Sequence, residues 1–367
     1  MKKNIAFLIY SLNSGGAERV VSTLSNGLCN NFNITIITII NDKPFYKLKE
    51  NIKVIACKDH KFRLKNKLLN SLKTNCYLYK DIKKICKNES IDIIIGFMTE
   101  SNVLAIFTAK ALKIPVIVSE RNYPPLASIS NFWKVMRRIT YPKTNILVVQ
   151  TKPIFDFFKN TMKEEKIKIL ANPISKNHSE AKKNLRIHKE NIILNVGSLN
   201  RQKGQDIAIR AFAQVNAPNW QLHLLGEGPK RKEYTSLIKE LEMEDKIILN
   251  GRNNYISNYL LKSKIFIFPS RFEGFPNALT EAMYMGLPCI STDCPTGPQE
   301  LIKDGVNGFL TPVDNIEILA KTIDKLIRNK DLRQIMGQKA AKSVTHLEED
   351  KVTKHWEKLI NTTLQNS

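Results

Sequence analysis

Two carboxylates eight positions apart form the most informative chemical pattern in the chain. Glu273 and Glu281 lie in the segment 270–282, directly after the apolar run 265–268. A carboxylate repels phosphate, but it accepts hydrogen bonds well, and two vicinal hydroxyl groups can donate to it together. The pair therefore predicts a ligand with hydroxyl groups at both of its ends and phosphate groups between them.

The residues between the two carboxylates predict a loop that leads into a helix. Asn277 is a favourable N-cap, and a helix that begins there places Glu281 in or near its first turn, where the helix dipole stabilises the ionised carboxylate. A surface loop held by ion pairs is the alternative. Surface packing gives no reason for the sequence Gly-Phe-Pro at 274–276, and this favours a ligand-binding loop.

A second segment has the composition of a diphosphate-binding loop. Residues 197–204 read Gly-Ser-Leu-Asn-Arg-Gln-Lys-Gly and follow the apolar run 192–196. Lys203 would act as a point charge on a phosphate group, and Arg201 can pair with two oxygens at once. A solvated basic turn is the alternative interpretation of the same residues.

Glycines also follow other apolar runs. Gly15 and Gly16 precede a helix that is expected from Ala17, so their amide groups and the helix N-terminus favour an anion, although a tight turn accounts for them equally well. The pattern G-x-G-x-x-G is absent there, which disfavours a dinucleotide site. The segment 225–229, Leu-Gly-Glu-Gly-Pro, indicates a structural turn.

Two successive α/β patterns must position these segments. The first has strand-like runs at 5–10, 34–40, 52–57, 91–96, 115–119 and 145–150. The second has strands at 192–196, 221–225, 247–249, 265–268 and 289–291, and helices at 205–215, 230–242, 277–285 and 316–328. This alternation predicts doubly wound parallel sheets, which bind ligands beyond the carboxyl ends of their strands. We expect a polar linker at 171–190 and helical structure over 331–364.

The composition is that of a globular protein of about two domains. The chain has 367 residues, 43% hydrophobic and 25% charged, which excludes a mainly disordered chain, a collagen-like repeat and a disulfide-bonded miniprotein. The sequence shows no targeting or membrane-spanning segment. The first apolar run is too short for a secretory signal, and no run is long enough to span a membrane. The six cysteines show no C-x-x-C spacing, so neither a metal site nor a redox pair is expected, and they fit a reducing cytoplasm.

Positive charge is concentrated in the first half of the chain. The formal charge is +23, and residues 1–172 carry 29 basic and 12 acidic side chains. Such an excess predicts an anionic partner, with the base composition of the genome as the alternative explanation. In 58–87 and 132–138, Lys and Arg alternate with Leu, Tyr, Phe and Trp. This pattern suits an anionic membrane surface, and an ordinary amphipathic helix with solvated lysines is the alternative. No nucleic-acid partner is expected, because neither a nucleic-acid-binding fold nor a stacking platform is recognisable.

Taken in order, the motifs resemble those of the retaining family-4 glycosyltransferases, which have the GT-B fold of two Rossmann-like domains. The resemblance covers about residues 5–330. It comprises the Gly-Gly loop, G-x-L-x-x-x-K-G at 197–204, L-G-x-G-P at 225–229, E-G-F-x-x-x-x-x-E at 273–281 with A-x-x-x-G-x-P after it, and a G-x-x-G-φ-L turn at 305–310. Within that family the chain resembles in particular bacterial enzymes that extend polyprenyl-diphosphate-linked glycans, such as N-acetylgalactosaminyltransferases.

The resemblance implies a domain organisation and a function. Residues 1–170 would form a domain that faces the acceptor and the membrane, with a C-terminal helix at about 346–367 packed back on it. Residues 171–345 would bind the nucleotide-sugar. The enzyme would transfer a hexose or an N-acetylhexosamine, for example GalNAc, from a UDP-sugar to a lipid-linked saccharide. It would retain the anomeric configuration, use no metal or cofactor, and work in the cytoplasm at the inner face of the cell membrane. A catalytically inert binding or scaffold subunit of the same fold is the alternative.

The resemblance also implies residue roles. Glu281 would hold the ribose, Glu273 would contact the donor sugar, and Lys203 with Arg201 would neutralise the departing diphosphate. The acceptor and the diphosphate would lie near Gly15, Gly16, Glu120 and Arg121. The other donor-binding residues would be Gly197, Ser198, Gly226, Gly251, Arg252, Gly274, Phe275, Pro276 and Asn277.

The sequence departs from the family pattern at two positions. Ser198 stands where the family often has Arg, and Arg201 is the residue that could replace that charge. Arg121 follows Glu120 where many members have His, so a His hydrogen bond to the donor sugar would be absent or replaced by Arg121. None of the six histidines lies in a motif.

Overall fold

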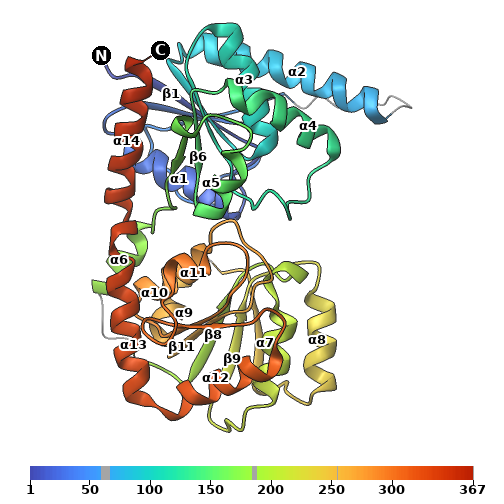
Figure 1. The fold of residues 1–367 in the computed structure, drawn as a ribbon, viewed down its shortest axis with the longest axis vertical. Helices are drawn as coiled ribbons and strands as arrows, with labels where there is room; N and C mark the ends of the chain where they lie inside the picture. Colours follow the sequence, from blue (N-terminus) through green and yellow to red (C-terminus); the bar gives the residue numbers. More distant parts are fainter. Residues whose placement is uncertain (59–66, 184–187, 254, 367) are drawn as a thin grey trace. The chain divides into compact units, whose positions relative to one another are not determined.

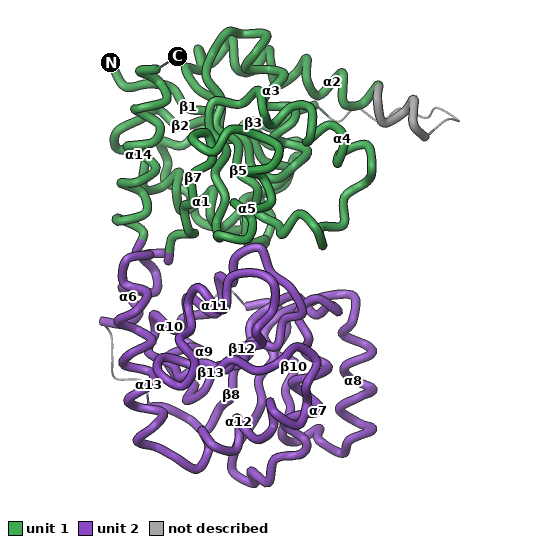
Figure 2. The backbone as a smooth tube through the Cα atoms, in the orientation of Figure 1, with its two compact units in different colours: residues 1–173, 349–367 green, residues 174–348 purple. Residues whose placement is uncertain are grey.

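The computed structural model describes residues 1–58, 67–183, 188–253 and 255–366, and the chain forms two compact units (Figure 2). Unit 1 comprises Met1–Pro173 together with Glu349–Ser367, and unit 2 comprises Ile174–Glu348. Each unit is a parallel β-sheet with helices packed against it (Figure 1). The predicted fold class, α/β with two Rossmann-like units, is confirmed. Within the basic segment 58–87, residues 59–66 lie outside the described part of the chain.

Unit 1 is built on a seven-stranded sheet with the order β3-β2-β1-β4-β5-β6-β7. Its strands are β1 (Asn4–Ile9), β2 (Asn33–Thr38), β3 (Lys53–Ala56), β4 (Ile93–Phe97), β5 (Val116–Ser119), β6 (Ile146–Val149) and β7 (Ile167–Ile169). Its helices are α1 (Gly16–Leu28), α2 (Lys67–Asn88), α3 (Thr99–Leu112), α4 (Asn131–Thr140), α5 (Lys152–Phe158) and α14 (Glu349–Gln365). In the register of the central strands, Ile5 lies opposite Ile34 of β2 and Ile93 of β4.

The alternation of side chains along β1 divides the core of unit 1 into two layers. Ala6 and Leu8 join the apolar cluster beneath α2, α3, α4 and α5, whereas Ile5 and Phe7 join the cluster beneath α1 and α14. Both faces of the sheet are therefore covered. This explains why its strands are continuous runs of Ile, Val and Leu rather than alternating apolar and polar residues.

Unit 2 is built on a six-stranded parallel sheet with the order β10-β9-β8-β11-β12-β13. Its strands are β8 (Ile192–Val196), β9 (Gln221–Leu225), β10 (Ile247–Gly251), β11 (Ile265–Phe268), β12 (Cys289–Thr292) and β13 (Phe309–Thr311). The helices are α6 (Lys176–Lys183), α7 (Gln205–Ala213), α8 (Arg231–Glu240), α9 (Ile256–Lys262), α10 (Asn277–Tyr284), α11 (Pro298–Leu301), α12 (Ile316–Arg328) and α13 (Lys330–Ser343).

The order of the strands reverses once in each sheet. In unit 1 the chain moves outward from β1 to β3 and then returns to place β4 on the other side of β1. In unit 2 the same reversal puts β8 beside β11. Such a switch point leaves room beyond the carboxyl ends of the two central strands, and it is where open α/β sheets bind ligands.

Several elements differ from those expected from the sequence. The predicted linker at 171–190 is wrong over Lys176–Lys183, which form helix α6. Strands β7 and β13 do not follow from the sequence pattern, since a strand of three residues gives too short an apolar run to recognise. Asn277 is not the N-cap of α10. It is the first helical residue, and Pro276 precedes it without a capping hydrogen bond from a side chain.

The last helix of the chain completes the core of unit 1. Trp356 of α14 is fully buried, and its ring stacks on Phe97 of β4 with 6.0 Å between the centroids. Gly27 of α1 lies so close to α14 that an added Cβ would come within 2.7 Å of the hydroxyl oxygen of Thr353. No helix in the described ranges has the length and apolar character needed to cross a membrane.

We expect Trp356→Ala to destabilise unit 1 by about 3–5 kcal/mol, because the truncation leaves a cavity between α14 and the sheet. The measurement is native-state hydrogen exchange in peptides from β1 and α1. The matched control is His355→Ala, since His355 is exposed on the same helix. Equal protection of β1 in the two variants would show that α14 does not stabilise unit 1.

Candidate functional site

The predicted ligand-binding loops of unit 2 meet at the switch point of its sheet. The loop 197–204 follows β8, and the loop 269–276 follows β11, which is the neighbouring strand. Carboxyl ends of parallel strands lie at one edge of a sheet, so these loops come together although 70 residues separate Lys203 from Glu273 in the sequence.

An ion pair joins the two loops. The ammonium of Lys203 lies 2.7 Å from the Oε1 atom of Glu273 and 5.5 Å from the centre of the Phe268 ring. The side chain of Glu273 is only 5% exposed, whereas that of Lys203 is 23% exposed. A lysine ammonium has three N–H donors and Glu273 takes one of them, so donors remain for an anionic ligand.

The backbone around Glu273 is fixed by the segment that follows β12. The amide of Glu273 donates to the carbonyl of Pro295 over 2.8 Å, and the amide of Thr296 donates back over 3.1 Å. The hydroxyl of Thr296 donates to the carbonyl of Gly274. The amide N–H groups of Gly274 and Phe275, by contrast, have no acceptor among the residues that the structure describes. Amides held in this way suit an anion.

Arg271 connects the same two loops on the other side, a role that no sequence motif indicates. Its guanidinium donates to both carboxylate oxygens of Asp206 on α7, over 3.0 and 2.7 Å, and to the carbonyl of Arg201 over 2.6 Å. It also pairs with Asp314 at 2.7 Å. The hydrogen bond to Asp206 raises the pKa of Arg271, so the guanidinium stays charged. We regard Arg271 as a positioning residue for the ion pair between the two loops.

Glycine is required where the loops approach most closely. Gly204 has a φ of 65°, and a Cβ there would collide with the carbonyl oxygen of Pro269. Gly226 has a φ of 151°, and its Cβ would collide with the carbonyl oxygen of Gly197. The amide of Gly226 donates to the carbonyl of Gly251 over 2.8 Å. Gly197, Gly226 and Gly251, three of the predicted donor-binding residues, therefore lie side by side at the ends of β8, β9 and β10.

Glu281 has a partner that sequence analysis missed. It is buried in the second turn of α10, and its Oε2 atom lies 3.5 Å from Nε2 of His178 on α6. The other ring nitrogen of His178 lies 3.0 Å from the hydroxyl of Ser257, which precedes β11 on α9. This chain fixes the orientation of the Glu281 carboxylate. His178 falls in the segment expected to be a linker, so no motif marked it.

The remaining predicted donor residues lie at the edges of these loops. Ser198, Arg201 and Arg252 are exposed, and Asn277 is partly exposed at the start of α10. The side chains at 275 and 276 are buried. In the described part of the chain, no group of three or more His, Cys, Asp or Glu side chains has an arrangement that could hold a metal ion.

Unit 1 contains a buried polar cluster at the end of β5. The Oε2 atom of Glu120 accepts hydrogen bonds from Thr99 and Tyr141, both over 2.9 Å, and lies 3.8 Å from the guanidinium of Arg137. Burial, together with the charge of Glu120, raises the pKa of Tyr141. The phenol therefore stays protonated and donates to the carboxylate.

Arg121, the next residue, is buried against β4. Its guanidinium carbon lies 4.5 Å above the centre of the Phe97 ring, and one of its nitrogens donates to Asn172. Its Nε and second terminal nitrogen have no partner among the described residues. Burial lowers the pKa of Arg121 to about 9, against the opposite effect of Glu120, so the guanidinium is charged at neutral pH.

The glycines after β1 are covered by an acidic side chain. Gly15 directly precedes α1, and the Glu18 carboxylate folds back over it, where it accepts from the hydroxyl of Ser11 over 3.3 Å. Burial raises the pKa of Glu18. An anion that approached Gly15 and Gly16 would have to displace this carboxylate. Among the residues that the structure describes, the predicted acceptor residues at 120 and 121 form no hydrogen bond or ion pair with these glycines. Arg121 instead contacts Phe97 of β4 and Asn172, and Glu120 lies near Arg137 of α4.

Two parallel sheets, each with a switch point, together form the architecture known as the GT-B fold. Solved structures agree on the fold. The Anabaena HepE protein, crystallised in complex with UDP and glucose, matches 98% of this chain and 100% of its own with a TM-score of 0.81 at 18% identity. Residues 177–343 match the family described as glycosyl transferases group 1, and residues 29–140 match the N-terminal domain of glycosyltransferase family 28.

The chain belongs to the group 1 glycosyltransferase family. An N-acetylgalactosamine-N,N'-diacetylbacillosaminyl-diphospho-undecaprenol 4-alpha-N-acetylgalactosaminyltransferase of Campylobacter jejuni is 31% identical over 349 residues, which cover 92% of this chain and 94% of the relative. A second GalNAc-transferase of Campylobacter jejuni, whose name specifies a diNAcBac-PP-undecaprenol glycan, is 28% identical and covers 97% of this chain and 98% of its own length. The family resemblance predicted from the motifs is confirmed.

We expect Gly204→Ala to destabilise unit 2 by more than about 1 kcal/mol, because alanine is strained at this positive φ and its Cβ collides with Pro269. Hydrogen exchange in peptides from β8 and β11 measures the effect. Gly305→Ala is the matched control, because Gly305 has a similar φ of 70° with no atom within 4 Å of an added Cβ. If both variants lose equal stability, the packing of the two loops contributes nothing beyond backbone strain.

Proposed function

We propose that the protein is a retaining glycosyltransferase that moves a hexose or an N-acetylhexosamine from a UDP-sugar to a polyprenyl-diphosphate-linked saccharide at the inner face of a bacterial membrane. The observation that carries this proposal is the Lys203–Glu273 pair at the switch point of unit 2, next to the amides of Gly274 and Phe275, which have no acceptor in the described chain. The cation and the amides match the diphosphate of a nucleotide-sugar and the charge that develops on it as it departs, and the carboxylate matches a sugar hydroxyl.

The main chemical task is to stabilise the departing nucleoside diphosphate. Preorganised donors in a site shielded from water do this best. In the proposal, Lys203 keeps its contact with Glu273 and gives its remaining N–H donors to the diphosphate, while the two amides contact the same charge. Arg201 is exposed on the same loop and would supply the second cation in place of the arginine that the family often has at Ser198. These groups would provide the charge without a metal.

Glu273 and Glu281 would recognise hydroxyl groups. Glu273 is buried and already paired with Lys203, so it would hold the donor sugar rather than attack it. The acceptor hydroxyl would then attack from the face that the diphosphate leaves, and a phosphate oxygen would take its proton. Glu281, oriented by His178, would hold the two ribose hydroxyls.

The names of the relatives support the proposed acceptor. Both Campylobacter enzymes are named for undecaprenol-linked glycans, and a third relative, 26% identical over 95% of this chain, is named for amylovoran biosynthesis in Erwinia amylovora. For this chain, a lipid-linked diphosphate acceptor would also account for the positive charge of residues 1–172, because both the lipid and the membrane surface are anionic.

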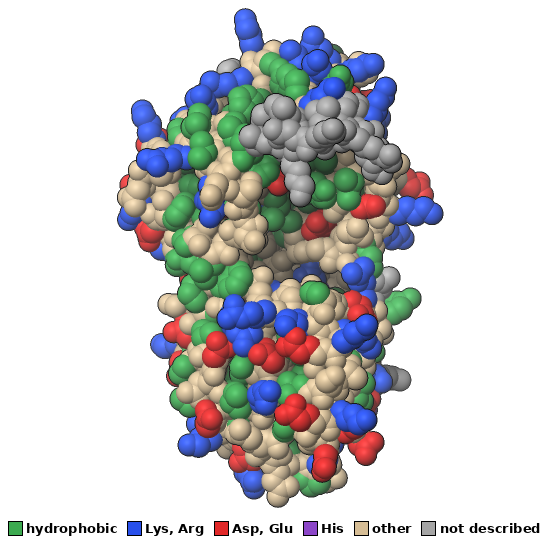
Figure 3. Space-filling model, turned by 90° about the vertical axis from the view of Figure 1, so that its right-hand side faces the viewer, with side chains coloured by type: hydrophobic (Ala, Val, Ile, Leu, Met, Phe, Trp, Pro, Cys, Tyr) green, Lys and Arg blue, Asp and Glu red, His purple; other side chains and the backbone are tan. Residues whose placement is uncertain are grey.

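The surface of unit 1 supports a peripheral membrane site. Helix α4 exposes Val135 and Ile139, each more than half exposed, beside exposed Lys134 and Arg138. Hydrophobic and basic side chains reach the surface on the side of unit 1 where α2 and α4 lie (Figure 3). Apolar and basic residues together are what an interfacial helix needs.

We expect Glu281→Ala to lower the affinity for UDP by roughly 100-fold, because two hydrogen bonds from ribose hydroxyls to a carboxylate are lost. Isothermal titration of the full chain with UDP gives the affinity. Glu317→Ala is the matched control, since Glu317 is exposed on α12 of the same unit. An unchanged UDP affinity in Glu281→Ala would refute the role of Glu281. A wild-type chain that binds UDP-sugars but transfers none to any lipid-linked saccharide would be an inert binding subunit.

We expect the double change Lys134→Gln and Arg138→Gln to weaken binding to phosphatidylglycerol vesicles at low salt by about 2 kcal/mol, or roughly 30-fold. Vesicle flotation at rising salt measures this. The matched control is Lys232→Gln with Lys239→Gln, two exposed lysines of α8 in unit 2. Wild-type protein that does not float with anionic vesicles at low salt would remove the membrane from the proposal.

A further inference from the structure

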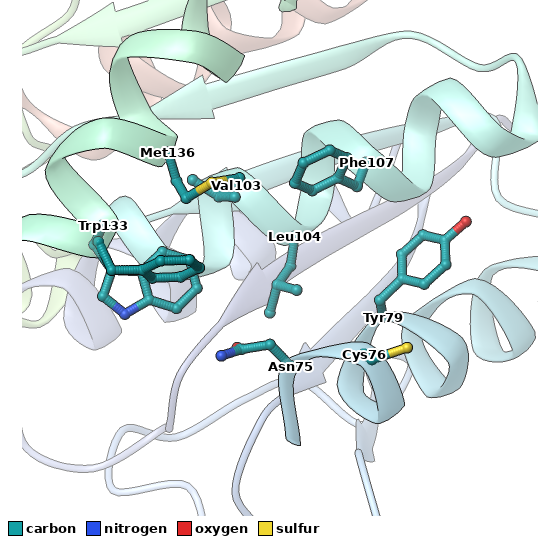
Figure 4. Close-up of a pocket in the computed structure, with 9 residues that line it drawn as sticks. Asn75, Cys76, Tyr79, Val103, Leu104, Phe107, Trp133 and Met136 are labelled. Atoms are coloured by element: carbon teal, nitrogen blue, oxygen red, sulfur yellow. The ribbon is translucent and has the colours of Figure 1, made fainter. Parts of the chain in front are cut away.

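An apolar pocket lies in unit 1 among helices α2, α3 and α4 (Figure 4). Its volume is about 280 Å³. Its lining side chains come from all three helices and are Asn75, Cys76, Tyr79, Val103, Leu104, Phe107, Phe132, Trp133 and Met136. None of them is charged. The pocket belongs neither to the switch point of unit 2 nor to the polar cluster around Glu120.

The pocket is open to solvent although its walls are apolar. Phe107 of α3 is 42% exposed, and Cys76 of α2 is exposed at the rim. An exposed phenylalanine at the edge of an apolar hollow indicates a binding site rather than ordinary surface. The Trp133 and Met136 side chains project from α4 toward Leu104 of α3 (Figure 4). An aromatic and methionine lining adapts to a flexible hydrocarbon.

The groups around the pocket carry positive charge. The ammonium of Lys83 lies 5.8 Å from the centre of the Tyr79 ring, which lines the pocket. On α4, Lys134 and Arg138 are exposed in the same helix turns as the lining residues Trp133 and Met136. An occupant that combines a hydrocarbon with an anionic end fits both features.

We propose that this pocket receives the first isoprene units of the polyprenyl chain of the acceptor, next to its diphosphate; this rests on the proposed function. In this proposal the diphosphate is bound above the membrane surface, so the isoprene units attached to it leave the bilayer. Exposing them to water is unfavourable in proportion to their apolar area. A pocket flanked by cations removes that cost for the units nearest the diphosphate.

The size of the pocket fits a short stretch of chain. An apolar cavity of about 150 Å³ can hold benzene, which has six carbons, so 280 Å³ accommodates about two five-carbon isoprene units but not a whole polyprenyl tail. The rest of the chain would stay in the bilayer. A phospholipid acyl chain has no such reason to enter, because its headgroup does not leave the membrane surface.

Cys76 provides a direct test, because it lies at the rim and is the exposed member of the six cysteines. Burial raises the pKa of Cys57, Cys86 and Cys294 to about 12. Since the thiolate is the reactive form, these buried thiols react slowly at neutral pH. A thiol reagent should therefore modify Cys76 first, and its rate of modification reports the occupancy of the pocket.

The experiment follows this rate in the full chain. The protein is treated with a maleimide at pH 7, and the alkylation of Cys76 is followed by mass spectrometry of its peptide. The probe is farnesyl diphosphate. Inorganic diphosphate and phosphatidylglycerol vesicles are the comparison additions.

We expect farnesyl diphosphate at about ten times its Kd to slow the alkylation of Cys76 by roughly tenfold. Inorganic diphosphate should leave the rate unchanged, because it has no hydrocarbon to fill the pocket. Equal rates with and without farnesyl diphosphate would overturn the proposal. Protection by the vesicles alone that the pocket-filling change Met136→Trp abolishes would also overturn it, because the occupant would then be an acyl chain of the membrane rather than a bilayer covering the rim.

A pair of variants on α4 tests the location of the probe. Met136→Trp fills the pocket and should abolish the protection by farnesyl diphosphate. Asn131→Trp adds the same side chain at an exposed position of α4 outside the lining and should preserve it. Protection that persists in Met136→Trp would place the probe elsewhere and refute the proposal.

The test separates this inference from the proposed function. Protection of Cys76 requires neither a UDP-sugar nor turnover, and it is measured in unit 1. If UDP binds as expected but farnesyl diphosphate does not protect Cys76, the pocket proposal fails alone. If farnesyl diphosphate protects Cys76 but no sugar is transferred, the isoprenoid pocket stands and the proposed transfer fails.

Discussion

The arrangement of unit 2 depends on one ion pair across the switch point of its sheet. Glu273 is almost completely buried, and a buried carboxylate without a partner is strongly unfavourable. Lys203 is therefore held in place, and with it the loop that follows β8. Arg271 reinforces the same junction through Asp206 on α7, and Gly204 permits the loops to touch. The contacts of Arg271 and the close approach at Gly204 thus keep the Lys203 and Glu273 side chains together.

Unit 1 uses its polar groups differently. Glu120 is satisfied by two hydroxyl donors and approached by Arg137, so this cluster is a closed network within the fold. Arg121 beside it retains two nitrogens without partners among the described residues. Charged and apolar side chains are instead presented together on α4, at the margin of the pocket. In the proposed function, unit 2 binds a small polar ligand, whereas the exposed surface of unit 1 at α4 contacts an amphiphile.

Much of the fold could be predicted because it follows from local patterns. The runs of Ile, Val and Leu at β1, β8 and β11 are continuous, as expected for strands covered on both faces. Short elements escaped prediction, because β7 and β13 have three residues each and take their structure from the neighbouring strand. Helix α6 was also not predicted, because its structure depends on contacts outside its own sequence. Its sequence is polar and lysine-rich, and its buried His178 points to a partner that is remote in the sequence.

The sequence by itself determined the α/β class, the positions of the main strands and the residue types at the strand ends, because these depend on short-range patterns and on the ligand chemistry of each side chain. Only the tertiary structure decided which of those residues meet. It paired Lys203 with Glu273, placed His178 against Glu281, and returned α14 to unit 1. The physical reason is that such contacts join segments far apart in the chain, where strand order and close packing, rather than local propensity, fix the neighbours.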